Sequence, residues 1–464
     1  MAPELRVYRL PEAAPGRLVS SLRADAALQT LERDRPSGRL LATTADDPLV
    51  AEEWWRDMVG IQGLTPPGPG KPVTVVDSGI SAAHPEFTGR ANLELLNPQE
   101  PAPFGGEHGT MVSSLVGAPV NGVGMVGIYP DAVLREWDAA LGEGRALATS
   151  DIVAGIVAAA RRGPGVINLS LGGPDRDSLV EQAVGLAMRS GSLVVAAAGN
   201  EGRDGVAGYP AALPHVLTVG ATTRNGAVAA FSTPSRYVDL AAPGADMLVA
   251  SAQSNSWQSG ASGTSFSAPL VSGAAAWVWT ARPELDNTQL FEVMRRSSRD
   301  IPPAGKDNAS GFGELDVGRA LTWPAPIPDP REPNDDMEFV RPSGFFATGT
   351  APLTTTSRTR SSLAARLDSV EDPRDLYRVR LPARRSVRVT VRSGVDVNLA
   401  VWKEGTFTVE QPPSGARLAV SAHTGTGNES LVVKASPRGR WAYVAVTPGR
   451  GVVGAEYRLS VVAS

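Results

Sequence analysis

The stretch from about residue 46 to residue 323 alternates short apolar runs with longer helical runs, and this pattern restricts the possible folds most strongly. Such alternation predicts an α/β fold with a doubly wound, mostly parallel sheet covered by helices on both faces. The expected strands are residues 73–76, 133–137, 166–170, 193–197 and 216–219. The expected helices are residues 108–117, 150–161, 178–190, 269–281 and 287–298. Ligands of this fold class bind beyond the carboxyl ends of the strands.

A different pattern follows a proline-rich segment. Residues 324–333 hold five prolines and predict a stiff linker. Beyond it the helical periodicity stops, and short alternating runs separated by turn residues predict a β-sandwich. We therefore expect an N-terminal extension (1–45), an α/β domain (46–323), the linker (324–333) and a C-terminal β-sandwich (334–464).

Composition excludes several classes of function. The net charge of −4 gives no basic excess for binding nucleic acid. No run approaches the ~18 consecutive apolar residues of a membrane span. The chain has no cysteine, which excludes disulfides and thiolate metal sites.

Four polar residues follow strands or open helices of the α/β pattern. Asp77 ends an apolar strand, Asn200 ends the run that begins at Leu193, and His108 and Ser265 open helical runs. A serine hydroxyl needs a base near neutral pH, and histidine is the natural one. A carboxylate fixes the histidine tautomer, and an asparagine amide can donate to a developing oxyanion. Taken singly, each residue is a common turn former or helix cap, so only their combination indicates catalysis.

The Ser265 stretch also predicts a helix start. Gly263-Thr264-Ser265-Phe266-Ser267-Ala268-Pro269 precedes a long apolar run of small residues, which is typical of a buried helix. Proline is tolerated in a first helical turn, so we expect the helix to begin just after Ser265. The free N–H groups and the helix dipole there favour a negative oxygen beside the serine.

The sequences around these four residues resemble the subtilisin family of serine proteases. Val-Val-Asp77-Ser-Gly-Ile, His108-Gly-Thr-Met-Val, Ala-Ala-Gly-Asn200-Glu-Gly and Gly-Thr-Ser265-Phe-Ser-Ala-Pro match its aspartate, histidine, oxyanion-asparagine and serine motifs, in the family's order. The resemblance covers residues 46–323 and implies a subtilisin-like fold and a serine endopeptidase. It assigns the catalytic roles to Asp77, His108, Ser265 and Asn200, with no cofactor required for the chemistry.

The resemblance also implies a substrate cleft. Two segments match the walls of the family's substrate-binding cleft, and a glycine falls at the floor of the primary pocket: Ser170, Leu171, Gly172 and Gly173; Ala197, Ala198 and Gly199; and Gly208. A glycine floor predicts a deep pocket for large apolar or aromatic side chains. Glu201 is expected at its rim, where it would help a basic residue bind.

The chain departs from the family pattern beside the nucleophile, where Phe266 and Leu270 replace the usual Met and His. Glu86 and Asn121 match positions that help to bind calcium in some relatives, so a structural calcium ion is a further expectation, although the sequence does not define its ligands. The other histidines, His84, His215 and His423, lack the motif context of His108 and are expected to be structural.

The ends of the chain resemble accessory modules. Arg331–Asp336, Asp375-Leu376-Tyr377 and Tyr457–Val461 resemble a bacterial pre-peptidase C-terminal domain, and residues 1–45 resemble the latter part of an inhibitory propeptide. We accordingly expect a secreted bacterial enzyme, and we expect that its signal peptide is not part of this chain. It would act as a monomer on protein or peptide substrates.

Two alternatives remain open. The chain would be a catalytically silent binding protein if the sandwich were its working module, or a processing protease if it acted on one partner.

Overall fold

The computed structural model describes residues 47–99, 106–140, 147–425 and 427–464. The expected extension at 1–45 lies outside the described residues. Seven strands of the described chain form one parallel sheet in the order β2-β3-β1-β4-β5-β6-β7. Their bounds are β1 (Val73–Asp77), β2 (Leu93–Leu95), β3 (Leu134–Asp138), β4 (Val166–Leu169), β5 (Leu193–Ala197), β6 (Val216–Thr222) and β7 (Val238–Pro243). The α/β expectation is confirmed.

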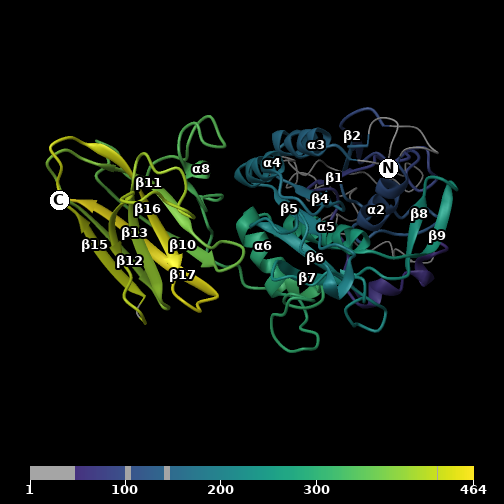
Figure 1. Cartoon of the computed structure of the whole chain (residues 1–464). Coiled ribbons are helices and arrows are strands. Elements are labelled where there is room, and N and C mark those ends of the chain that lie inside the picture. The colour runs from purple at the N-terminus through teal and green to yellow at the C-terminus, as the bar shows by residue number, and fades with distance from the viewer. Residues whose placement is uncertain (1–46, 100–105, 141–146, 426) are drawn as a thin grey trace, which may run out of the picture. The chain divides into compact units, whose positions relative to one another are not determined.

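The central strands are buried on both faces because helices cover the sheet on each side (Figure 1). On one face, α2 (Glu107–Gly117) and α5 (Thr264–Ala281) pack with apolar side chains of β1, β5 and β6 in one core. On the other face, α3 (Thr149–Arg161) and α4 (Ser178–Arg189) pack against the alternate residues of the same strands. This explains why the strands read as continuous apolar runs.

Short elements complete this part of the chain. An antiparallel hairpin is formed by β8 (Met247–Ser251) and β9 (Ser256–Ala261). The helices α6 (Asn287–Arg296) and α7 (Val317–Thr322) follow α5, and short 3₁₀ turns lie at η2 (Val50–Glu52), η3 (Trp54–Asp57) and η4 (Gly202–Asp204). The sequence pattern did not predict the hairpin, β2 or β7.

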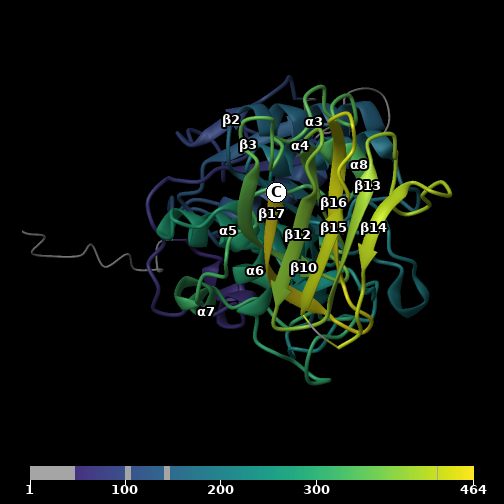
Figure 2. The same ribbon diagram turned by 90° about the vertical axis from the view of Figure 1, so that its left-hand side faces the viewer.

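The C-terminal part is a sandwich of two antiparallel sheets, each four-stranded in the described residues (Figure 2). One sheet has the order β10-β17-β12-β15, and the other has the order β11-β16-β13-β14. The bounds are β10 (Arg360–Asp368), β11 (Asp375–Leu381), β12 (Val387–Ser393), β13 (Val397–Lys403), β14 (Arg417–Ser421), β15 (Asn428–Val433), β16 (Arg440–Pro448) and β17 (Gly454–Ala463). The inward residues of both sheets form one apolar core, and the short helix α8 (Met337–Val340) packs beside it in a smaller cluster.

The proline-rich segment packs against both parts of the chain. Gln289 of α6 donates to Pro326 O at 2.7 Å, and the buried Asp329 accepts from the backbone N of Arg366 in β10 at 2.7 Å. This segment is therefore hydrogen-bonded to an element of each part of the chain.

Candidate active site

The parallel sheet brings four predicted residues to its carboxyl edge. Asp77 is the last residue of β1, and Asn200 lies in the loop that follows β5. His108 and Ser265 are each the second residue of a helix, α2 and α5. Residues far apart in the chain therefore share one edge, because parallel strands all end on the same side.

The buried Asp77 and the partly exposed His108 form a hydrogen-bonded pair. The His108 Nδ1 atom lies 2.8 Å from Asp77 Oδ1 and 3.0 Å from Oδ2. The backbone N–H of Ser78 donates to Asp77 Oδ1 at 2.7 Å, which holds the carboxylate in place. An ionised carboxylate only accepts hydrogen bonds, so the proton of a neutral His108 is on Nδ1 and the lone pair on Nε2.

The charge of Asp77 sets the basicity of His108. The carboxylate raises the pKa of His108 above its usual value, and this effect outweighs burial, which lowers the pKa. Asp77 is 2% exposed, whereas 40% of the His108 side chain is exposed. The ring is therefore held by a buried anion and remains open to a ligand.

A glycine permits the approach of α2 to β1. A Cβ atom on Gly109 would lie 2.0 Å from the backbone O of Gly79, far inside van der Waals contact. The residue after His108 must lack a side chain, because the first turn of α2 lies directly on the turn that follows Asp77.

The helix that carries Ser265 starts earlier than the sequence predicted. It begins at Thr264, so Pro269 lies inside α5 beyond its first turn. Proline has no N–H to donate to the carbonyl four residues earlier, which is that of Ser265. Ser170 Oγ supplies the missing donor at 2.9 Å, which allows a proline beyond the first turn. The predicted helix start after Ser265 was therefore wrong.

The nucleophile position is tied to the predicted substrate segment. The Ser265 hydroxyl donates to Ser170 O at 3.3 Å, a long hydrogen bond, and in the described residues it has no hydrogen bond to His108. The His108 ring centre lies 6.0 Å from that of Phe266, the residue after Ser265. His108 thus lies beside the residue that follows Ser265, while the Ser265 hydroxyl is directed to Ser170 O.

Asn200 is oriented by Thr264. Its Oδ1 atom accepts from Thr264 N at 2.8 Å and from Thr264 Oγ1 at 3.0 Å. Thr264 Oγ1 in turn accepts from Gly199 N at 3.1 Å. Two donors on Oδ1 define which side of the carboxamide carries the oxygen. The Nδ2 group is left without an acceptor in the described part of the chain.

The residues predicted to bind substrate form two backbone segments. Gly172 and Gly173 are exposed, and Gly173 pairs with Tyr209 through N–O distances of 3.0 and 2.8 Å. The predicted opposite wall continues β5, where Ala197 and Ala198 are buried and Gly199 is half-buried. A Cβ atom on Gly208 would lie 3.0 Å from Gly173 O, so this glycine keeps the two backbones close. Leu171 is half-buried beside these segments.

Some side chains have partners that the sequence did not indicate. Glu201 accepts from Thr233 Oγ1 at 2.7 Å, and its backbone N donates back to the same oxygen at 3.0 Å. The roles of Thr264 and Ser170 in holding Asn200 and Ser265 were also missed. Only the Gly-Thr-Ser order and the position of Pro269 could have pointed to them.

Glu86 and Asn121, which the resemblance links to calcium, lie together. Asn121 Nδ2 donates to Glu86 O at 3.3 Å, and Asp47 Oδ1 accepts from the backbone N of Asn121 at 3.2 Å. Glu86 Oε1 and Asp47 Oδ2 are buried without a partner in the described residues, so both could bind a cation. However, Asn121 Oδ1 accepts from Val123 N at 2.9 Å. Burial raises the pKa of Glu86 to about 7. These residues fit part of a calcium site.

Known proteins match the chain over its α/β part. The sequence profile of the subtilase family matches residues 68–313. Subtilisin BL of Lederbergia lenta is 36% identical over 259 residues, which is 56% of this chain and 93% of that protein. The alkaline protease of Alkalihalobacillus alcalophilus is 33% identical over 304 residues, which is 65% of this chain and 74% of that protein.

Solved structures of proteases are also similar to this chain. The S41 psychrophilic protease is 29% identical with a TM-score of 0.50, covering 57% of this chain and 97% of that one. A protease from Pseudoalteromonas arctica PAMC 21717 is 26% identical with a TM-score of 0.51, covering 60% of this chain and 98% of that one.

The fold and its relatives define a class of enzymes that hydrolyse peptide bonds with a serine residue. Within that class, the chain belongs to the subtilase family and is a subtilisin-like serine endopeptidase.

No helix in the described ranges has both the length and the apolar character that crossing a membrane requires.

Proposed function

We propose that Asp77, His108 and Ser265 form the catalytic triad of this endopeptidase and that Asn200 stabilises the oxyanion. The observation that carries the proposal is the hydrogen bond between His108 Nδ1 and Asp77 Oδ1, at 2.8 Å, beside the first turn of α5. This contact directs the Nε2 lone pair of His108 away from the carboxylate and toward the substrate side.

In the proposed mechanism, His108 Nε2 takes the proton of the Ser265 hydroxyl while Oγ attacks the peptide carbonyl carbon. The negative oxygen of the tetrahedral intermediate accepts from Asn200 Nδ2 and from the backbone N–H of Ser265. His108 then gives its proton to the leaving amine nitrogen as the C–N bond breaks. Water, deprotonated by His108, cleaves the acyl-enzyme ester by the same steps, which returns the proton to Ser265.

The proposed substrates are extended peptides that pair with the exposed backbone of Gly172, since the backbone N and O of Gly173 already pair with Tyr209. We propose a preference for large apolar or aromatic residues before the cleaved bond, because the opposite walls present small residues, Ala197, Ala198 and Gly199. Glu201 already accepts a hydrogen bond from Thr233, which weakens the idea that it selects basic residues. The hydrolysis rates of peptides with Phe, Leu, Lys or Glu before the cleaved bond would rank the preference. The highest rate with Glu would exclude the proposed preference for apolar or aromatic residues.

We further propose that the enzyme is secreted, by analogy with a bacterial subtilisin and a bacterial alkaline protease. It would act as a monomer. It would not bind nucleic acid, because its net charge of −4 provides no basic excess. Calcium at Glu86 would stabilise the fold and take no part in the chemistry.

The decisive test compares the native chain with Ser265→Ala. A fluorophosphonate probe should label the native protein stoichiometrically at Ser265, and the variant should lose both labelling and peptide hydrolysis while keeping its circular dichroism spectrum. Unchanged turnover in Ser265→Ala would exclude the triad. Absence of labelling in the native chain would favour the silent binding protein, and a casein digest limited to one or two cuts would favour a processing protease.

A further inference from the structure

One outer face of the C-terminal sandwich carries a group of arginines. It belongs to the sheet β10-β17-β12-β15, whose strands lie side by side (Figure 2). Side chains alternate along each strand, and the inward ones, such as Val389 and Leu459, lie in the apolar core. Four exposed arginines occupy the outward positions, and we call them the arginine face: Arg360, Arg388, Arg392 and Arg458.

The register of the strands arranges the outward residues in three rows that cross the sheet. In the order β10, β17, β12, β15, the rows are Ala364, Arg458, Arg392 and Asn428; Ser362, Ser460, Thr390 and Ser430; and Arg360, Val462, Arg388 and Val432. The middle row consists of hydroxyl side chains, and the Oγ atoms of Thr390 and Ser430 lie 3.3 Å apart. A row of hydroxyl groups therefore separates the two rows that hold the arginines.

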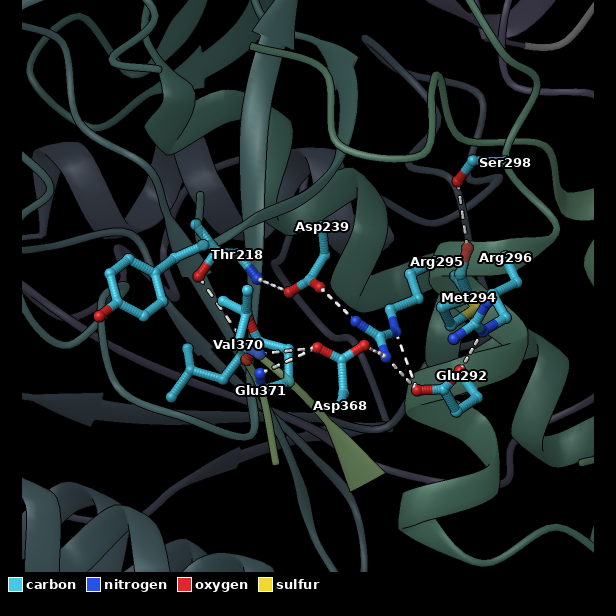
Figure 3. Close-up of polar contacts among 12 residues, drawn as sticks. Thr218, Asp239, Glu292, Met294, Arg295, Arg296, Ser298, Asp368, Val370 and Glu371 are labelled. Carbon is cyan, nitrogen blue, oxygen red and sulfur yellow. Dashed lines mark hydrogen bonds and ion pairs between the residues drawn. The ribbon is translucent and has the colours of Figure 1, made fainter. Parts of the chain in front are cut away.

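The arginine face is not neutralised by the protein itself. Within the described ranges, none of its four guanidinium groups has a hydrogen bond, an ion pair or an aromatic ring as a partner. Two acidic residues share the outward register, Asp368 and Glu456, but both lie beyond the first row. Asp368 is already paired with Arg295 of α6 at 2.8 Å (Figure 3).

Arginines on the other sheet of the sandwich are arranged differently. Arg378 and Arg380 of β11 lie over the ring of Trp441 at 4.0 and 5.2 Å from its centroid. Such stacking stabilises a cation on the protein surface. The lack of partners is therefore a property of the arginine face and not of sandwich arginines in general.

The arrangement weakens the sheet when nothing is bound to it. Arg392 and Arg458 lie directly opposite each other on β12 and β17. Like charges at directly opposed strand positions are destabilising. An anionic group placed over both guanidinium groups would turn this repulsion into attraction, so the pair suits a negatively charged ligand.

The charge of the sandwich supports the same sign of ligand. The whole chain has a net charge of −4, yet residues 334–464 contain eighteen Lys or Arg and twelve Asp or Glu. Screening limits the reach of exposed charges to ~10 Å at 0.1 M salt, so the local excess determines the field at this face. Arg388 and Arg392 are four residues apart on one strand, which is ~13 Å. The charges are thus spread over a distance that suits a polymer better than a single small anion.

The outward side chains distinguish between kinds of polyanion. A guanidinium group binds a carboxylate or a similar oxyanion through two parallel N–H donors. The hydroxyl groups of the middle row both donate and accept, as sugar hydroxyls require. The three rows contain no aromatic side chain on which the bases of single-stranded nucleic acid could stack. These features favour a polysaccharide over a nucleic acid.

We propose that the arginine face binds a linear acidic polysaccharide and holds the peptidase on that polymer. Carboxylate or sulfate groups of the polymer contact Arg392 together with Arg458, and further groups contact Arg360 and Arg388. Sugar hydroxyls bond to the middle row. Binding uses no residue of the proposed catalytic site.

The experiment uses the full-length Ser265→Ala protein, so that self-digestion does not interfere. Binding to immobilised heparin, polygalacturonate and neutral dextran is measured by surface plasmon resonance at 0.1 M and at 1 M sodium chloride. We expect saturable binding to at least one acidic polymer and none to dextran. Binding should be lost at 1 M salt, where the screening length falls to ~3 Å. Comparing heparin with polygalacturonate shows whether sulfate or carboxylate is preferred.

Arg392→Gln with Arg458→Gln tests the opposed pair. This double variant should raise the Kd for the acidic polymer about tenfold or more, because charge-assisted hydrogen bonds are lost. Its Tm without polymer should equal or exceed that of its parent, because the repulsion is removed. If its Tm were lower, Arg360→Gln with Arg388→Gln would test for the same loss of binding.

Two further variants separate this face from general charge. Arg378→Gln with Arg380→Gln removes the same charge from the other sheet and should leave the Kd unchanged. Arg392→Lys with Arg458→Lys keeps the charge without the planar donors and should weaken binding severalfold. In the active enzyme, Arg392→Gln with Arg458→Gln should hydrolyse a short peptide at the native rate, so the result does not depend on the proposed catalytic site.

Three results would overturn the proposal. The first is no binding to either acidic polymer at 0.1 M salt. The second is an equal Kd for the parent and for Arg392→Gln with Arg458→Gln. The third is tighter binding to a single-stranded DNA oligonucleotide than to both polysaccharides, which would identify the face as a nucleic-acid site.

Discussion

Ser170 Oγ donates a hydrogen bond at 2.9 Å to the backbone O of Ser265, the carbonyl that Pro269 leaves without its helical donor. This contact joins the segment proposed to bind substrate to the first turn of α5. We expect Ser170→Ala to lower kcat about tenfold, since an unsatisfied buried carbonyl costs ~1–3 kcal/mol and allows the turn to shift. Ser170→Thr keeps the hydroxyl and should recover most of the activity. Steady-state hydrolysis of a chromogenic peptide measures both, and equal kcat for Ser170→Ala and the native enzyme contradicts the role.

Thr264 provides a second prediction, because its hydroxyl holds Asn200 Oδ1 at 3.0 Å. Asn200→Ala should lower kcat by ~10²–10³-fold with KM nearly unchanged, the magnitude known for a lost oxyanion donor. Thr264→Val should reproduce part of this loss, and Thr264→Ser should not. If Thr264→Val raised KM and left kcat alone, its hydroxyl would serve substrate binding and not the oxyanion.

The pH dependence follows from Asp77 and His108. Asp77 raises the pKa of His108, and only the neutral imidazole acts as the base, so kcat/KM should rise with pH through this raised value. Asp77→Asn removes the negative charge, so the acidic limb should move to lower pH while the plateau falls by ~10⁴-fold. Glu107→Gln serves as a control, because Glu107 contributes less to the pKa of His108. An acidic limb that stays in place in Asp77→Asn shows that another group titrates.

Gly173 offers a test of the substrate cleft. A Cβ atom on Gly173 meets no other atom within 4 Å, so a side chain there fits the folded chain without a clash. Gly173→Val should therefore keep the native Tm within about 1 °C, because surface substitutions without new contacts change stability by under ~0.5 kcal/mol. It should lower kcat/KM for long peptides by placing a side chain beside the exposed backbone of Gly172, on which they are proposed to pair. If Gly173→Val kept the native kcat/KM for those peptides, the proposed position of the substrate would be wrong.

Arg295 and Arg296 are neighbours on α6, and we expect them to contribute very different amounts to stability (Figure 3). Arg295 is fully buried and contacts Asp239, Glu292 and Asp368, whereas 42% of the Arg296 side chain is exposed. Arg295→Met removes the ion-pair partner of Asp239 and Asp368, while Glu292 keeps Arg296, and should cost about 3–5 kcal/mol. Arg296→Met should cost less than about 1 kcal/mol. Urea unfolding in the Ser265→Ala background compares them, and equal losses would refute the assignment of the stabilising charge to Arg295.

The sequence predicted the parallel sheet well because its strands are continuous apolar runs and its helices carry clear periodicity. The first turn of α5 was misjudged because a side chain 95 residues away in the chain, Ser170, replaces the donor that proline lacks. Periodicity contains no such long-range information. The strand β9 escaped prediction because its residues are half-buried or exposed and mixed in character.

The candidate site was predicted by motif, but its supporting contacts were not. Side chains such as Thr264 and Ser170 act through hydrogen bonds that depend on three-dimensional distance. The sequence also did not predict that the carboxylates of Asp329, Glu332, Asp372 and Asp375 lie together, since they come from two separate segments that look like ordinary acidic turns. Glu332 and Asp375 were noticed only as parts of a domain motif.

Under the proposed mechanism, the order of elements along the chain would delay hydrolysis during synthesis. The proposed base, His108, emerges early, whereas α5 with Ser265 follows all seven strands of the sheet. At ~5–20 residues per second, roughly 10–30 s separate the two on the ribosome. A nascent chain therefore holds an imidazole with nothing to activate, and it cannot cut itself or its neighbours until the last central helix enters a finished sheet.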